Sequence, residues 1–288
     1  MLSDSESQHG TPDPVSLNVR DRVFVSTWIE AGVDISVPSI ARVYDALLDG
    51  KDNFPADRAV HDQLIQVIPD GKTAAQYNRQ VLRRGVEFMV EQGVRQFIDL
   101  GSGLPAAENT HQVAQRIAPE SKVAYVDIDP IVLAHGRALL AENRNTTVIT
   151  ADFRRPDEVL SNPDVTALID LSKPVGLLML AVVHHVHDDE DPAGLVRAYV
   201  DRVVSGSHLF LTHFVDHGEE TKPVEQVLLN ELTRGRFRSI EEITSYFDGL
   251  ELIEPGVVYN PLWRPTEPVA RPYPLAVRLV AGGIGRKS

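Results

Sequence analysis

The chain contains no cysteine, so disulfide bridges and thiolate metal sites are excluded. It also lacks an apolar run long enough to cross a bilayer, and the longest, VGLLMLAVV at residues 175–183, predicts a buried strand instead. The opening residues, MLSDSESQHG, have neither the basic nor the apolar region of a secretory leader. We therefore expect a cytoplasmic protein with no membrane segment.

Positive charge is scarce. The 28 Lys and Arg residues are outnumbered by 41 Asp and Glu residues, which gives a net charge of −13. This balance argues against binding to nucleic acid or to an anionic membrane, and it is compatible with a cationic ligand. The 288 residues, of which 43% are hydrophobic, suffice for one large α/β domain with a helical addition. Nothing in the sequence indicates an oligomeric state.

The first third of the chain is predicted to be a tail followed by helices. Residues 1–20 are polar and rich in Ser, Asp and Pro, so we expect a disordered tail. Residues 21–93 are expected to form an N-terminal helical cap. Within it, apolar residues at helical spacing predict helices over 39–50, 55–71 and 73–93.

Residues 94–288 alternate between strand and helix patterns, which predicts a parallel, doubly wound α/β sheet. The expected elements are strands near 95–101, 122–129, 146–153, 174–183 and 207–214, and helices near 106–118, 131–143, 156–160, 191–204 and 239–249. Two last stretches, 250–259 and 273–285, have no helix between them and predict an antiparallel hairpin. A mostly parallel sheet of seven strands with such a hairpin is similar to the Rossmann-like fold of class I S-adenosylmethionine (SAM) methyltransferases.

The stretch FIDLGSGLP contains a strand, a glycine turn and a helix signal. The predicted strand carries Asp99 near its end, and Gly101 and Gly103 flank Ser102. Glycines permit a tight turn and let a ligand approach bare backbone. Pro105 suits the first position of a helix. This order is typical of a nucleotide-binding α/β unit.

Two further acids follow the next two predicted strands. Asp127 lies in YVDIDP, where a carboxylate can accept both ribose hydroxyls of a nucleoside, and Ile128 would lie beside the base. Asp152, in TADF, lies at the end of the third strand, followed by Phe153. In class I methyltransferases an acid at this point receives the adenine amine. Because parallel strands end at one edge of the sheet, these groups should converge there.

Several longer blocks resemble one family. PSIARVYDALLDGKDNFPADR, NRQVLRRGVEFMVEQGVRQFIDLGSGLP, VAYVDIDPIVLAHGRALL, DLSKPVGLLMLAVVHHVHDDEDP and FDGLELIEPGVVYNPLWRP are similar to the bacterial, mainly actinomycete S-adenosyl methyltransferase family, once described as a domain of unknown function. The resemblance runs from about residue 36 to the end. It implies a class I fold and SAM as cofactor, but no particular acceptor. Asp49 stands where the family more often has glycine.

The segment HHVHDDED, residues 184–191, follows the fourth strand and leaves three interpretations open. His184 or His185 could contact the ligand or acceptor, and a neutral imidazole there could take a proton from an attacking O–H or N–H. The segment could instead bind a divalent metal, or its acids could merely cap the next helix. We expect the catalytic role for His184 and His185 and assign no metal site.

The cap supplies further candidate residues. The polar loop GKDNF follows the first helix, and we expect Tyr44, Lys51 and Asn53 to lie near the cofactor as part of a lid. Arg79 could meet the SAM carboxylate, although arginines on one helix often form only a solvated face.

The combined prediction is a SAM-dependent methyltransferase acting on a small molecule. Two alternatives stay open at this point: a non-catalytic SAM-binding regulatory module and, third, an NAD-dependent oxidoreductase.

Overall fold

The computed structural model describes residues 33–106, 108–140 and 143–288. The tail predicted over 1–20 and the first part of the predicted cap, 21–32, lie outside the described residues.

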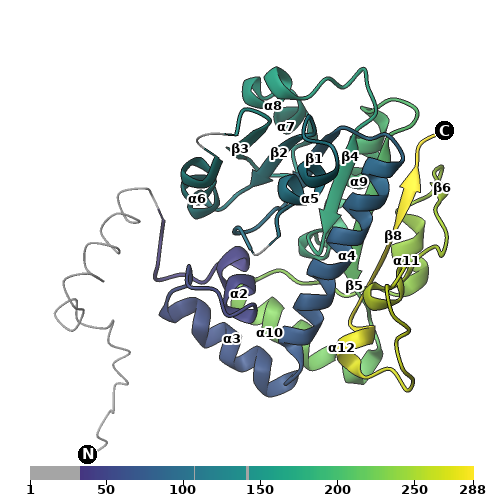
Figure 1. The fold of residues 1–288 in the computed structure, drawn as a ribbon. Coiled ribbons are helices and arrows are strands. Elements are labelled where there is room, and N and C mark those ends of the chain that lie inside the picture. The colour runs from purple at the N-terminus through teal and green to yellow at the C-terminus, as the bar shows by residue number, and fades with distance from the viewer. Residues whose placement is uncertain (1–32, 107, 141–142) are drawn as a thin grey trace, which may run out of the picture.

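An eight-stranded sheet forms the centre of the fold, with strand order β3-β2-β1-β4-β5-β8-β6 and with β7 also paired to β8 (Figure 1). The strands are β1 (Gln96–Leu100), β2 (Lys122–Asp127), β3 (Thr146–Thr150), β4 (Gly176–Leu180), β5 (His208–Phe214), β6 (Glu251–Leu252), β7 (Val258–Tyr259) and β8 (Val280–Arg286). The first five are parallel, and β8 is antiparallel to its neighbours. This confirms the predicted class. The stretch 250–259 supplies two short strands rather than one, so the sheet has one strand more than expected.

Helices cover both faces of the sheet. They are α4 (Gly71–Glu91), α5 (Thr110–Ile117), α6 (Pro130–Leu140), α7 (Pro156–Leu160), α8 (Pro163–Leu168), α9 (Pro192–Asp201), α11 (Ile240–Ser245) and α12 (Leu275–Arg278). All five residues of β1 are buried, as expected for a parallel strand covered on both faces. Phe97 belongs to the apolar cluster under α4 and α5, whereas Ile98 and Leu100 belong to the cluster under α8, α9 and α11.

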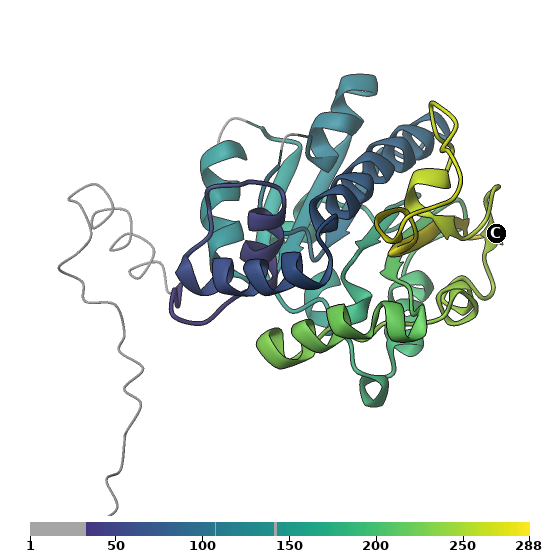
Figure 2. The same cartoon turned by 90° about the horizontal axis from the view of Figure 1, so that it is seen from below.

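The cap lies across the carboxyl ends of the strands. It consists of α2 (Ile40–Leu47), α3 (Pro55–Val67), the start of α4 and α10 (Lys222–Leu232), which lie together at that edge in two perpendicular views (Figures 1 and 2). Helix α4 joins the two layers. Its Ala74 packs in the apolar cluster of the cap, and its Met89 packs on the sheet. Helix α4 therefore contributes side chains to both the cap and the sheet layer.

The structure differs from the sequence prediction in several local elements. The helix expected over 106–118 begins only at Thr110, because Asn109 forms a capping box with Gln112. Pro105 therefore does not begin a helix. The strand expected over 273–285 begins at Val280, since residues before it form α12. Helices α8 and α10 were not predicted.

Candidate functional site

A cavity of about 430 Å³ lies between the carboxyl edge of the sheet and the cap. Its volume is in the range of small-molecule sites. Most of the residues predicted from the sequence line it: Tyr44, Arg79, Asp99, Gly101, Ser102, Gly103, Asp127, Ile128, Asp152, Phe153, His184 and His185. These residues come from the cap and from the loops after β1, β2, β3 and β4, so the tertiary fold brings together side chains far apart in the sequence.

Lys51 and Asn53 are not among the residues that line this cavity. Lys51 is exposed, and the Asn53 amide donates hydrogen bonds to the Asp45 carboxylate at 2.9 Å and to the Gly50 carbonyl at 3.0 Å. The buried Asp45 also accepts the backbone N–H of Asp52 at 2.9 Å. A Cβ on Gly50 would lie 1.9 Å from Asp45 Oδ1. The block YDALLDGKDNF therefore encodes a loop folded around one carboxylate.

The glycine turn after β1 leaves its backbone open to the cavity. Gly101 and Gly103 both have φ of 67°, a left-handed conformation that favours glycine. A Cβ on Gly101 would lie 2.2 Å from Val182 Cγ2, whereas a Cβ on Gly103 would meet nothing within 4 Å. Between them, Ser102 has a buried hydroxyl with no hydrogen-bond partner. The turn thus offers both open space and an unsatisfied polar atom to a ligand.

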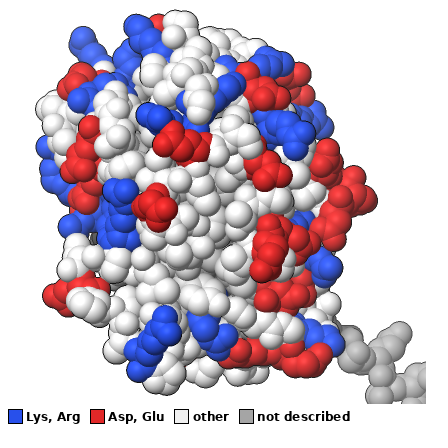
Figure 3. Space-filling model, turned by 90° about the vertical axis from the view of Figure 1, so that its right-hand side faces the viewer, with Lys and Arg blue, Asp and Glu red and all other residues white. Residues whose placement is uncertain are grey.

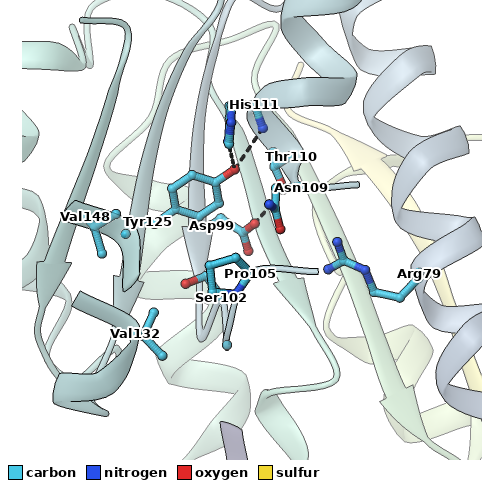
Figure 4. Close-up of a pocket in the computed structure, with 12 residues that line it drawn as sticks. Arg79, Asp99, Ser102, Pro105, Asn109, Thr110, His111, Tyr125, Val132 and Val148 are labelled. Atoms are coloured by element: carbon cyan, nitrogen blue, oxygen red, sulfur yellow. Dashed lines mark hydrogen bonds between the residues drawn. The ribbon is translucent and has the colours of Figure 1, made fainter. Parts of the chain in front are cut away.

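Asp99 is a buried carboxylate at this turn. It accepts a hydrogen bond from the Thr110 hydroxyl at 2.6 Å, and burial raises its pKa to about 6. Arg79 points from α4 toward the small pocket of about 30 Å³ beside Asp99 (Figure 4), and its guanidinium donates to the Glu108 carbonyl. Arg79 opposes the rise of the Asp99 pKa without reversing it. A cationic ligand would stabilise this carboxylate further.

Asp127 lies at the end of β2 and is bound to the glycine turn. Its Oδ2 accepts the Gly103 N–H at 2.8 Å, and its Oδ1 accepts the Asp129 N–H at 2.9 Å. Burial raises the pKa of Asp127 to about 6. Each carboxylate oxygen has a second lone pair, so the group can still accept hydroxyls from a ligand. The neighbouring Ile128 is 61% exposed and lines the cavity, so an apolar surface is available beside the acid.

Asp152 is paired within its own loop. The Arg154 guanidinium donates to both of its oxygens, at 2.7 to 3.1 Å, and also to Glu190 at 2.9 Å. Burial alone would raise the pKa of Asp152, but the hydrogen bonds and charge of Arg154 lower it overall. The adjacent Phe153 carbonyl accepts the Tyr199 hydroxyl at 2.6 Å. Asp152 is therefore ionised and held in place at the cavity wall.

His184 and His185 are 2% and 7% exposed, and their ring centroids lie 3.8 Å apart. Nδ1 of each is buried without a hydrogen-bond partner. Burial holds the pKa of His184 well below its usual range and lowers that of His185 to about 3, so both rings are neutral at pH 7. In the same segment Asp191 caps α9 by accepting the Gly194 N–H at 3.0 Å. The segment thus combines a capping acid with two neutral imidazoles at the cavity.

The metal interpretation of this segment finds no geometric support. Across residues 33–106, 108–140 and 143–288, no group of three His, Asp or Glu side chains is arranged to hold a metal ion.

A buried charge cluster connects the cap to the turn after β2. Arg42 lies 3.6 Å from an oxygen of Asp57 and 3.5 Å from one of Asp129, and the Ser39 hydroxyl also donates to Asp129. Of the two acids in YVDIDP, only the first, Asp127, was predicted to lie in the site. The second acid, Asp129, was the available signal for this contact.

His213, near the end of β5, is also buried beside the pair His184 and His185. Its ring lies 5.9 Å from that of His184, and its Nε2 contacts Arg238 at 3.0 Å.

Comparison with known proteins gives a consistent result. A family model described as S-adenosyl methyltransferase matches residues 26–288. A crystal structure from Thermobifida fusca YX, solved as that of a candidate methyltransferase, is 49% identical, has a TM-score of 0.87 and covers 90% of this chain and 98% of its own. A structure from Streptomyces avermitilis MA-4680, described as a DUF574 family protein, is 34% identical with a TM-score of 0.84 and covers 88% and 100%. No curated protein matches.

Proposed function

The chain belongs to the S-adenosyl methyltransferase family, and from this premise we propose that its cavity holds SAM against the ends of β1, β2 and β3 and a small-molecule acceptor under the cap. The protein is a SAM-dependent methyltransferase. The observation that carries the placement is the meeting of the glycine turn with three strand-end acids at one cavity.

The residues at this edge fit the parts of SAM. The open backbone at Gly103 and the unpaired Ser102 hydroxyl would receive the methionyl part. Asp127 would accept ribose hydroxyls, and Ile128 would pack on the adenine. Asp152 would accept the adenine amine beside Phe153. The sulfonium and ammonium charges of SAM would offset the cost of keeping Asp99 and Asp127 ionised in a buried setting.

Tyr44 and Arg79 complete the proposed site from the cap side. The Tyr44 hydroxyl donates to the Ala75 carbonyl at 3.2 Å, so the ring is fixed at the cavity wall. Arg79 is directed at the same turn as Asp99 and would meet a carboxylate of the ligand. We leave Lys51 and Asn53 out of the proposed contacts, since neither lines the cavity.

When bound, SAM supplies a methyl group on a positively charged sulfur, which is a strong electrophile. The chain has little covalent chemistry to perform. The cap would exclude water and orient the acceptor in line with the methyl group, and a neutral His184 or His185 would receive the acceptor's proton.

The nicotinamide alternative is disfavoured by the sheet itself. Dinucleotide-binding sheets continue past the fifth strand with a parallel sixth one. Here the neighbour of β5 is the antiparallel β8.

We further assign the enzyme to the bacterial cytoplasm and expect no nucleic-acid partner. The two similar solved structures described above come from Thermobifida fusca YX and Streptomyces avermitilis MA-4680. The net charge is −13, and on the face shown in Figure 3 acidic and basic side chains are interspersed. None of the helices among the described residues combines the length and apolar character needed to span a membrane.

Calorimetric titration with SAM, S-adenosylhomocysteine and NAD tests the proposal, and the first two should bind while NAD should not. Gly103→Ala provides the sharper test, with Gly93→Ala as its control. Both glycines have positive φ and open space around a new Cβ, so both variants should lose about 1–2 kcal/mol of unfolding free energy. Only Gly103→Ala should weaken SAM binding. If the two variants bind SAM with equal affinity, the cofactor does not bind at the glycine turn.

A further inference from the structure

The cavity has a second, apolar half away from the strand ends. Its wall comes from α2, α3, α10 and the residues around the start of β8. Leucine and related side chains dominate it, namely Leu47, Leu64, Ile68, Val224, Leu228 and Leu279. All six belong to the apolar cluster of the cap or pack against it. A ligand in this half would therefore be surrounded by hydrocarbon.

No charged partner is available there. The described residues that α2, α3, α10 and β8 contribute to the cavity wall include no Lys, Arg, Asp or Glu. Arginines line other parts of the cavity: Arg234 donates to Glu190 at 2.6 Å and to the His185 carbonyl at 2.9 Å, and Arg79 lies beside Asp99 at the glycine turn. Burying an ion without a partner is costly, so this half selects against charged molecules.

A neutral base lies where the two halves meet. The His184 ring contacts the Phe214 ring edge to face, with 4.5 Å between centroids, and both residues line the cavity. The Arg236 N–H donates to the His184 carbonyl at 2.7 Å, which fixes the backbone of this residue. An acceptor with its apolar body in the second half can thus present one polar group to His184.

We propose that the methyl acceptor is a small uncharged phenol, with its ring in the apolar half and its hydroxyl at His184. This proposal rests on the proposed function. The reacting group is a hydroxyl because an alkylamine would enter as a cation, and the charged group that acts on His184 is the Arg238 guanidinium rather than a carboxylate. The hydroxyl is phenolic because the pKa of a phenol is about 10. The pKa of water, which is similar to that of an aliphatic alcohol, is about 15.7, so such a hydroxyl gives up its proton much less readily.

The transfer balances with groups already present. The phenol oxygen forms a bond to the methyl carbon, and the carbon–sulfur bond breaks with its electron pair remaining on sulfur. As the oxygen–carbon bond forms, the hydroxyl becomes strongly acidic, and its proton goes to a lone pair on the His184 imidazole, from which it later passes to solvent.

The test uses 2-naphthol, 2-naphthoate and 2-naphthylmethylamine, which share one ring system and differ in charge. Each is titrated by fluorescence into the full chain, with and without saturating S-adenosylhomocysteine. We expect 2-naphthol to bind at least about tenfold more tightly than either ion. Equal affinities, or preference for an ion, would overturn the proposal. If the chain does not bind S-adenosylhomocysteine but still prefers 2-naphthol to both ions, the proposed function is refuted and the acceptor proposal is not.

Two variants locate the site. Leu47→Lys puts a cation into the apolar half and should reverse the preference toward 2-naphthoate, whereas Leu48→Lys, on the next residue and outside the cavity wall, should not. His184→Gln should still bind 2-naphthol and S-adenosylhomocysteine but form no methylated product from SAM. An unchanged preference in Leu47→Lys, or full turnover in His184→Gln, would contradict the proposed placement.

Discussion

Replacing Asp99 by asparagine should stabilise the SAM-free protein and weaken its binding of SAM. The Asp99 side chain is only 6% exposed, and burial raises its pKa from 3.8 to about 6. The native state therefore holds this proton more tightly than the unfolded chain does. The stability that the protonated form contributes is fully present below pH 3.8 and is lost as the pH rises through about 6.

The gap between the two pKa values corresponds to about 3 kcal/mol of unfolding free energy at pH 8. Asparagine keeps an oxygen that can accept the Thr110 hydroxyl, but it loses the attraction of Arg79. We therefore expect Asp99→Asn to raise the unfolding free energy by about 1–3 kcal/mol at pH 8 and by little near pH 4. SAM affinity should fall, because an ionised Asp99 faces a cationic ligand.

Urea unfolding followed by circular dichroism from pH 4 to pH 8 measures the effect, and calorimetry gives the SAM affinity. Asp201→Asn, which changes an exposed carboxylate at the end of α9, is the control and should shift stability by less than about 0.5 kcal/mol at every pH. The reasoning fails if Asp99→Asn and the unaltered protein are equally stable at pH 8, or if their difference does not shrink toward pH 4.

Three further changes test other parts of the site. Asp127→Ala should weaken SAM binding by about 1–3 kcal/mol, measured by calorimetry, and an unchanged affinity would remove this carboxylate from the site. Lys51→Ala should bind SAM with the affinity of the unaltered protein. If residues 44–54 instead close over SAM as a lid, this variant should bind SAM more weakly, and SAM should slow the hydrogen exchange of these residues. Arg42→Ala leaves two buried carboxylates without their cation and should cost about 3–5 kcal/mol in urea unfolding, against less than about 1 kcal/mol for the exposed Arg58→Ala.

A series of contacts links the cap to the edge of the sheet at which the cofactor is proposed to bind. Arg42 and Ser39 bind Asp129, whose N–H binds the Asp127 carboxylate, which in turn binds the Gly103 N–H. The cap is therefore anchored through the same turn that is proposed to hold the ribose.

The sequence alone determined the class of the sheet and most of the residues that line the proposed cofactor site. Strand periodicity, the glycines of FIDLGSGLP and the acids after successive strands are local patterns, readable within a few residues. Their convergence needed only the rule that parallel strands end at one edge. Asp99, Asp127 and Asp152 accordingly line one cavity.

Only the tertiary structure determined which residues of the cap line the cavity and which form contacts within the cap. The loop residues Lys51 and Asn53 have the polar character of a binding loop, yet Asn53 satisfies Asp45 and Lys51 faces solvent. The pairing of Arg42 with Asp129 and the packing of α10 against α3 join segments far apart in the chain. These contacts depend on which apolar surfaces pack together and on which buried charges form pairs. The local periodicity of the sequence predicts neither.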